Sequence, residues 1–200
     1  MKFLSTLFFI CFISVSAYSQ SHKTILIKEA NIYFDYMVKQ NFDGVLDYMY
    51  PKVFEMAPRE QMKAGMQQMF NAEDMTIQFL SNVVTQVTDT KNLEGITYAA
   101  IFYSSKMKMT FLTEEEQAED DKKGFLMFMK ATMQTQFGED NVVEELSTMS
   151  LIIDMDATMF AIDDPKYKGW KFLGNDDAMA TIVNSVIPES IRTELLNEKE

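Results

Sequence analysis

Cysteine, histidine, tryptophan and glycine are scarce in this chain of 200 residues, which holds one Cys, one His, one Trp and seven Gly. One Cys and one His exclude a thiolate metal site, a disulfide framework and a Ser-His-Asp triad. The few Gly form neither a phosphate-binding loop nor a dinucleotide-binding fingerprint. The chemistry that remains available is that of carboxylates, hydroxyl groups, Lys and Met.

Basic residues are also in the minority, with 18 Lys and Arg against 30 Asp and Glu and a net charge of -12. Neutralising phosphates requires clustered basic side chains, and the chain has no basic stripe or tail. Nucleic acid is therefore excluded as a partner. A hydrophobic share of 47% is enough to bury a real core in one domain.

The first 19 residues have the pattern of an export signal. Lys2 precedes an apolar run from Phe3 to Val15, and the small residues Ala17 and Ser19 stand where a signal peptidase would cut before Gln20. The pattern predicts a cleaved signal peptide over 1–19 and a single exported domain over 20–200, in the periplasm or outside the cell. Cleavage also removes Cys11. No later apolar stretch is long enough to predict a membrane span.

Helical spacing dominates the first third of the chain. It predicts a helix over 23–39, a short second helix capped by Asp43, and a third helix that starts at Pro58. Three thioethers on one face of the third helix, from Met62, Met66 and Met69, suggest soft copper ligands. The same three positions are expected in the core, which Met fills readily, so we expect no metal and no cofactor.

Alternation of apolar and polar residues takes over at Met75 and predicts strands over 75–88, 96–112 and 147–163 and a short one at 170–173. In the first strand, Val83 is expected on the apolar face and Asn82 on the polar face. An inserted helix is expected over 114–137, with an apolar stripe of Phe125, Phe128, Met129, Met133 and Phe137. Helices are also expected after Asp176. The fold class predicted is α+β: N-terminal helices packed on a curved, mainly antiparallel sheet of about four long strands, with an inserted helix and a C-terminal helix.

Three segments carry a family resemblance: Asn41-Phe42-Asp43-Gly44-Val45-Leu46-Asp47-Tyr48-Met49, then Pro51 with Pro58-Arg59-Glu60, and Lys168-Gly169-Trp170-Lys171-Phe172-Leu173. With the order of elements, they resemble the nuclear transport factor 2-like superfamily, which includes SnoaL-like proteins and has a cone-shaped fold. The resemblance implies a pocket between the concave sheet face and the helices. The side chains expected to bind a ligand there are Tyr33, Tyr36, Tyr98, Phe102 and Tyr103.

Asp154 and Asp156 are the acid/base candidates, because alternate residues of a strand stand about 7 Å apart on one face. Steroid-isomerase-like members of the superfamily use an Asp base with a Tyr donor, which requires carboxyls in apolar surroundings. Tyr98 is one candidate partner, with Tyr33, Tyr36 or Tyr103 as others. The alternative is that both aspartates line the solvent side of an antiparallel sheet.

The leading hypothesis is an exported, non-catalytic domain that binds a small apolar ligand or a protein partner in the cleft between helices and sheet. One alternative is a small enzyme that catalyses proton transfer with Asp154, Asp156 and Tyr98. A second alternative is a structural envelope protein that forms a homodimer through the open sheet face. His22 follows the predicted cut, where chains are usually loose, so it is expected to be neither ligand nor base.

Overall fold

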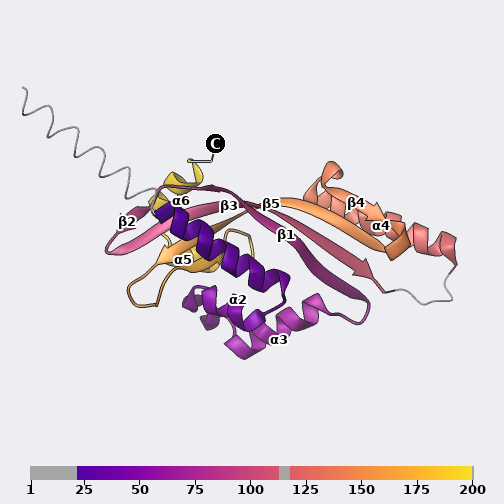
Figure 1. Cartoon of the computed structure of the whole chain (residues 1–200), viewed down its shortest axis with the longest axis horizontal. Coiled ribbons are helices and arrows are strands. Elements are labelled where there is room, and N and C mark those ends of the chain that lie inside the picture. The colour runs from indigo at the N-terminus through magenta and orange to yellow at the C-terminus, as the bar shows by residue number, and fades with distance from the viewer. Residues whose placement is uncertain (1–21, 113–117, 200) are drawn as a thin grey trace, which may run out of the picture. The chain divides into compact units, whose positions relative to one another are not determined.

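The computed structural model describes residues 22–112 and 118–199. The predicted signal peptide with Cys11, and the acidic residues 114–116, lie outside the described residues. The described chain is α+β with a mostly antiparallel, open sheet, which confirms the predicted fold class (Figure 1). It divides into two compact units. The described part of unit 1 comes from 22–32, 84–102 and 158–199, and unit 2 comprises 33–83 and 103–157.

The helices follow the predicted order. After an N-terminal helix over 22–38 come α2 (Phe42–Tyr48), the 3-10 helix η1 (Pro51–Glu55), α3 (Arg59–Phe70), α4 (Glu119–Phe137), α5 (Ala180–Val186) and α6 (Glu189–Leu196). Two further 3-10 turns, η2 (Glu139–Asn141) and η3 (Leu146–Thr148), flank one short strand.

The sheet contains three long strands, where the sequence predicts about four. The strands are β1 (Met75–Val87), β2 (Lys91–Leu93), β3 (Ile96–Phe111), β4 (Val142–Glu145), β5 (Ser150–Asp163) and β6 (Lys171–Gly174). Their order is β1-β3-β5-β4, with β2 paired to β3 and β6 paired to β5. The short strands β2 and β4 were not predicted, because a few residues are too short a window for alternation to be recognised.

Unit 1 is built on the ends of the long strands that are apolar on both faces. Five consecutive residues of β3, Tyr98 to Phe102, are buried, as the apolar character of both faces predicts. The β2–β3 hairpin turns through Glu94 and Gly95, whose φ angles of 53° and 84° suit a two-residue turn with both φ values positive. Lys91 of β2 reaches Glu194 of α6, with Nζ and Oε1 2.6 Å apart.

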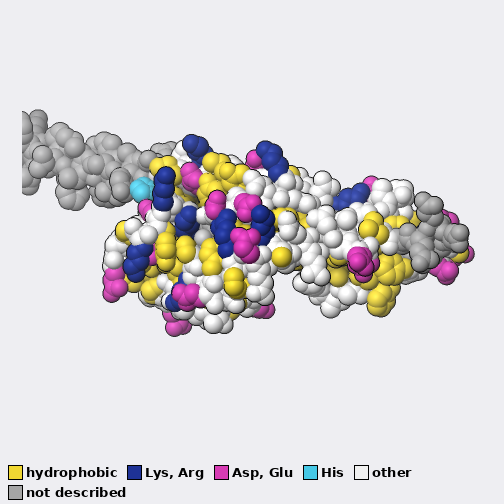
Figure 2. Space-filling view, turned by 90° about the horizontal axis from the view of Figure 1, so that it is seen from below, with side chains coloured by type: hydrophobic (Ala, Val, Ile, Leu, Met, Phe, Trp, Pro, Cys, Tyr) yellow, Lys and Arg dark blue, Asp and Glu magenta, His cyan; other side chains and the backbone are white. Residues whose placement is uncertain are grey.

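In unit 2, charged side chains join α3 to α2. The Arg59 guanidinium donates to the Asp47 carboxylate at 2.7 Å, and the Lys63 ammonium donates to that of Asp43 at 2.6 Å. Basic and acidic side chains lie side by side over this helical region (Figure 2). Asp43 was expected to cap α2, but the cap is Asn41, whose Oδ1 accepts from the Gly44 amide at 3.2 Å. Asp43 lies one residue inside the helix and is used in the ion pair instead.

One hydrophobic cluster of unit 2 lies on one face of the sheet. Alternate residues of β3 and β5 form it, together with Leu126 of α4 and Val142 of β4; its buried members are Met107, Met109, Phe111, Leu126, Val142, Met149, Leu151 and Ile153. The Phe70 ring of α3 packs on the Phe79 ring of β1 with centroids 5.7 Å apart. Two helical elements therefore cover different stretches of the same apolar face.

Two helix faces differ from the prediction. Phe128 was expected in the core but is 68% exposed, while Leu126, which the predicted stripe omits, is buried. Met69 of α3, also expected in the core, is 53% exposed. The apolar face predicted from a sequence is broad, so the buried side of the helix can be displaced by about one residue from the predicted one. The contacts with neighbouring elements decide which residues of that face are buried.

The alternation along β1 also changes phase. Met75, Ile77 and Phe79 pack against the core, as expected, but beyond the exposed pair Leu80 and Ser81 the inward positions become even-numbered. Asn82 is therefore turned inward, and Val83 is 56% exposed, the reverse of the sequence prediction. A one-residue slip of this kind is what a β-bulge produces, and it sends every later side chain to the opposite face.

Gly44 supports a first prediction. A Cβ at this position would stand 2.6 Å from the ring of Tyr36, closer than any real contact, whereas a Cβ on the exposed Gly65 of α3 meets nothing within 4 Å. We expect Gly44→Ala to lower the free energy of unfolding by about 1–2 kcal/mol through overpacking. Gly65→Ala is the control and is expected to raise it by about 0.5–1 kcal/mol. Urea denaturation measures both, and equal stabilisation by the two would contradict the packing described.

A second prediction concerns Glu145 at the end of β4. The Lys108 ammonium and the Thr148 hydroxyl donate to its carboxylate, and they hold its pKa below the ordinary value. Because the folded pKa is depressed, this contribution to stability is present above the unfolded pKa and is lost as the pH falls through the folded pKa. NMR titration of Glu145 is expected to show the lowered pKa, and Lys108→Met is expected to raise it. An unchanged pKa in Lys108→Met would contradict the ion pair.

Candidate functional site

Two hollows are lined by described residues of unit 2. The first, called the open cleft here, has a volume of about 460 Å³ and is lined by Ser104, Gln136, Phe137, Asn141, Asp154, Met155 and Asp156. The second, called the aromatic cavity, has a volume of about 100 Å³ and is lined by Tyr33, Phe34, Met37, Phe79, Asn82, Tyr103, Ser105, Met155 and Ala157. Met155 of β5 lines both hollows.

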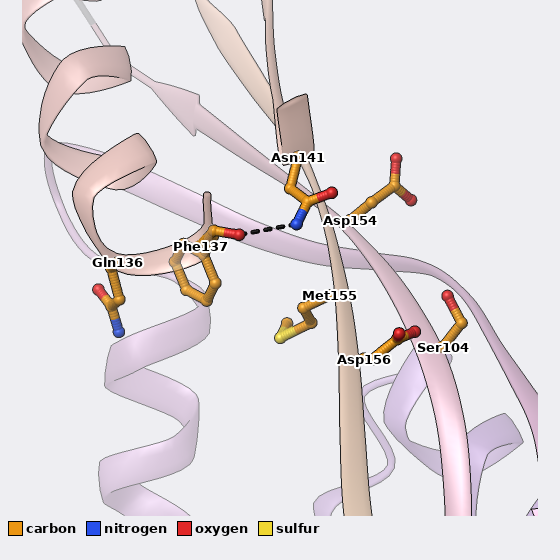
Figure 3. A pocket seen from close by; sticks show the side chains of 7 residues that line it. All are labelled: Ser104, Gln136, Phe137, Asn141, Asp154, Met155 and Asp156. Atoms are coloured by element: carbon orange, nitrogen blue, oxygen red, sulfur yellow. Dashed lines mark hydrogen bonds between the residues drawn. The ribbon is translucent and has the colours of Figure 1, made fainter. Parts of the chain in front are cut away.

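The open cleft contains both predicted aspartates. Asp154 and Asp156 project from β5 on the same side, and Met155 between them projects to the other side (Figure 3). The Asn141 amide donates to the Phe137 carbonyl at 2.7 Å and closes the end of α4 beside the cleft (Figure 3). The alternation along β5 thus separates the carboxylates from the thioether, as predicted for one strand face.

Both aspartates face water. Asp154 Oδ1 lies 3.4 Å from Lys106 Nζ, with the two side chains 46% and 44% exposed, and Asp156 is exposed. No tyrosine is among the described residues that line the cleft. The carboxylates therefore lack the apolar surroundings and the phenol donor that isomerase-like proton transfer needs. These positions match the alternative in which Asp154 and Asp156 line the wet side of the sheet.

The aromatic cavity lies between the N-terminal helix and the sheet. Its floor comes from the three adjacent strands β1, β3 and β5, and residues 33–37 of the helix cover it. The ring of Phe34 packs on that of Tyr103 with centroids 4.9 Å apart, and it lies 5.8 Å from that of Tyr33. These packed rings keep the wall of the cavity in one conformation, because aromatic side chains have few rotatable bonds and large contact areas.

Two residues that line this cavity each have a buried polar atom without a partner. Ser105 is 2% exposed, and neither its Oγ nor the Nδ2 of Asn82 makes a hydrogen bond within the described protein. An unsatisfied buried polar group costs about 1–3 kcal/mol, and over nine in ten such groups in native proteins are satisfied. The described protein therefore leaves hydrogen bonds unmade on two residues that line one small hollow, where a water or another molecule that reached them would satisfy them.

The five predicted ligand-binding residues do not lie together in the structure. Tyr33 and Tyr103 line the aromatic cavity. Tyr36 is instead packed beside Gly44, with its ring 6.2 Å from that of Tyr48. Tyr98 and Phe102 belong to unit 1.

Tyr98 and Phe102 are both buried in unit 1. Burial raises the pKa of the Tyr98 phenol, and the negative charges of Asp164 and Glu94 raise it further. The ammonium of Lys199 stands 5.6 Å from the centre of the Phe102 ring. Both residues fill the core of that unit.

Asn82 and Ser105 are the residues that sequence reasoning missed. Ser105 carries a visible signal, because it interrupts the apolar alternation between Tyr103 and Met107 on a face that is otherwise hydrophobic. Asn82 carries none, since its inward position depends on the change of phase in β1. A polar residue inside an apolar strand face was the pattern to look for.

The remaining candidates lie apart from both hollows. His22 is the first described residue of the N-terminal helix and meets the Trp170 ring edge-on at 6.4 Å, so it is not in the loose segment expected. Within 22–112 and 118–199, no group of three or more acidic, His or Cys side chains is placed to hold a metal ion. The same residues contain no helix with the length and hydrophobicity to cross a membrane.

Exposed apolar side chains lie on α4 and also on strands of the sheet, where Leu80 and Val83 of β1 are 41% and 56% exposed and Val143 of β4 is 56% exposed. Phe125, Met127 and Phe128 are 39%, 54% and 68% exposed, and hydrophobic side chains gather at the end of unit 2 that carries α4 (Figure 2). The open face carries polar residues such as Lys106 and Asp154. None of these observations tests the predicted homodimer through the open sheet face.

Comparison with known proteins returned no match to any family model, to any curated protein or to any solved structure. The resemblance to the nuclear transport factor 2-like superfamily therefore stays an expectation from sequence.

Ser105 and Ser150 make a matched pair for a third prediction. Both are buried, but Ser150 Oγ donates to the Thr148 carbonyl at 2.9 Å and lies 2.9 Å from Thr110 Oγ1, whereas Ser105 Oγ has no partner. Without ligand, Ser105→Ala is expected to raise the free energy of unfolding by about 1 kcal/mol, and Ser150→Ala to lower it by about 1–2 kcal/mol. Destabilisation by both, measured in urea, would show that the Ser105 hydroxyl is satisfied.

Proposed function

We propose that this protein is an exported, non-catalytic binding protein that holds a small, mainly apolar ligand in the aromatic cavity. The observation that carries the proposal is the pair of unpartnered polar atoms, Asn82 Nδ2 and Ser105 Oγ, on two residues that line a hollow together with aromatic rings and thioethers. Ligand sites in proteins have this composition, with mostly apolar walls and a few polar groups that orient the ligand.

The cavity is unsuited to catalysis by its own lining. None of the nine described residues that line it is Asp, Glu, Lys, Arg or His, so the lining offers the phenols of Tyr33 and Tyr103 but no carboxylate, amine or imidazole for acid/base catalysis. The two aspartates that could act as bases line the open cleft and face water. Binding without reaction is the function that this inventory supports best.

Two observations from the sequence agree with the proposal. The pattern of residues 1–19 predicts export, and the superfamily resemblance implies a pocket between helices and sheet, which is where the aromatic cavity lies in unit 2. Tyr33 and Tyr103, two of the residues expected to bind a ligand, are among its walls.

Filling the cavity tests the proposed function. Ala157 lines the aromatic cavity from β5, so Ala157→Leu places a branched side chain in the space that a ligand would occupy. Val83→Leu is the control, because Val83 is 56% exposed on β1. The assay is the shift of the melting temperature by small apolar compounds and by any compound that co-purifies with the protein.

The expected result is a ligand-dependent rise of the melting temperature in the unmodified protein and in Val83→Leu, and its loss in Ala157→Leu. Circular dichroism shows whether Ala157→Leu remains folded. The proposal is wrong if Ala157→Leu folds and keeps the same ligand-dependent shift, because the ligand would then bind elsewhere.

A further inference from the structure

The unpartnered atoms of the aromatic cavity also define the chemistry that the site recognises, if the proposed function holds. Asn82 Nδ2 is a donor only, so its missing partner has to be an acceptor. The Ser105 hydroxyl can either donate a hydrogen bond to the same ligand atom or accept one from it if that atom carries a hydrogen. An oxygen atom of a carbonyl or an alcohol answers both requirements.

Charge limits the ligand further. No Lys, Arg or His lines the cavity, and the chain as a whole carries a net charge of -12, so a carboxylate or phosphate would be buried without a counter-charge. The rings of Tyr33, Phe34, Phe79 and Tyr103 line the cavity, and the face of an aromatic ring attracts a cation. The Asn82 Nδ2 donor opposes a cation, because its hydrogens carry partial positive charge.

The volume of the aromatic cavity limits the size of the ligand. A cavity of about 150 Å³ in an apolar core holds benzene, so a hollow of about 100 Å³ holds a group of about four to six non-hydrogen atoms. The cavity accordingly fits a small molecule or the end group of a longer one.

We propose that the aromatic cavity recognises a neutral oxygen acceptor, a carbonyl or an alcohol, carried on a small apolar group. Asn82 donates to this oxygen, Ser105 completes its hydrogen bonding, and the rings and thioethers enclose the apolar part. This inference rests on the proposed function and specifies the class of ligand.

The test uses matched probes and methionine methyl groups as reporters. Cyclopentanone and cyclopentanol carry a neutral oxygen, cyclopentane has none, tetramethylammonium is a cation and acetate is an anion. In protein labelled at the Met methyls, Met37 lines only the aromatic cavity and Met155 lines both hollows, whereas Met127 is 54% exposed on α4 and serves as the internal control. Titration of each probe by NMR gives the affinities.

The expected result is that the ketone or the alcohol shifts Met37 and Met155, leaves Met127 unmoved and binds at least about tenfold more tightly than cyclopentane. Asn82→Leu and Ser105→Ala are each expected to reduce this preference severalfold, while Ser81→Ala, at an exposed neighbour of Asn82, leaves it unchanged. Ser105→Ala serves as the second variant because it is expected to fold at least as stably as the unmodified protein.

The failures are distinguishable. Tighter binding of cyclopentane, tetramethylammonium or acetate at Met37 overturns the ligand class and leaves the cavity as a binding site. A preference for the oxygen probes that survives in both variants also overturns it. If none of the probes shifts Met37, while a different ligand stabilises the protein and is blocked by Ala157→Leu, only the class fails. If nothing binds at all, the proposed function fails with it.

Discussion

The requirement to cover one apolar face of three long strands governs the structure of unit 2. Alternate residues of β3 from Tyr103 to Phe111 share this face, and no single helix covers it. Leu126 of α4 covers the part of the face that includes Met107 to Phe111. Residues 33–37 of the N-terminal helix cover the part that includes Tyr103 and Ser105, and Phe70 of α3 packs on Phe79 of β1. The part of the face under residues 33–37 of the N-terminal helix includes Asn82 and Ser105. The side chains of the helix and the strands do not fill this space completely, and the aromatic cavity remains between them. A cover made entirely of apolar side chains would be more stable, since two polar atoms are buried there without partners.

The two hollows of unit 2 show how one strand supplies different chemistry to its two sides. Along β5, Met155 lines the aromatic cavity as well as the open cleft, whereas its neighbours Asp154 and Asp156, of the two hollows, line only the open cleft. The carboxylates are the more conspicuous residues in the sequence, yet their exposure and the nearby Lys106 make them ordinary surface groups. Ser105 and Asn82 are less conspicuous in the sequence, but because each has a buried polar atom without a partner, they affect the stability of the fold more than the exposed carboxylates do.

Much of the fold could be predicted from sequence, because long periodic segments carry a strong signal. β3 was expected over 96–112 and runs over Ile96–Phe111, and the helix at 22–38 was expected at 23–39. The site was harder. Tyr33 and Tyr103 were named because the superfamily resemblance implies a pocket between helices and sheet, and both line the aromatic cavity. Asn82 was placed on the wrong face because the phase of β1 changes between Phe79 and Asn82, and a strand's sequence does not show where such a slip occurs. The exposed Phe128 fails for a similar reason, since the rotation of a helix about its axis is set by its neighbours.

The most direct test of this account is a crystal structure of the purified protein soaked with cyclopentanone. The account predicts the ring inside the aromatic cavity, with its oxygen within hydrogen-bonding distance of both Asn82 Nδ2 and Ser105 Oγ. It would be contradicted by a structure in which no ring enters the cavity and both atoms are satisfied by groups of the protein itself.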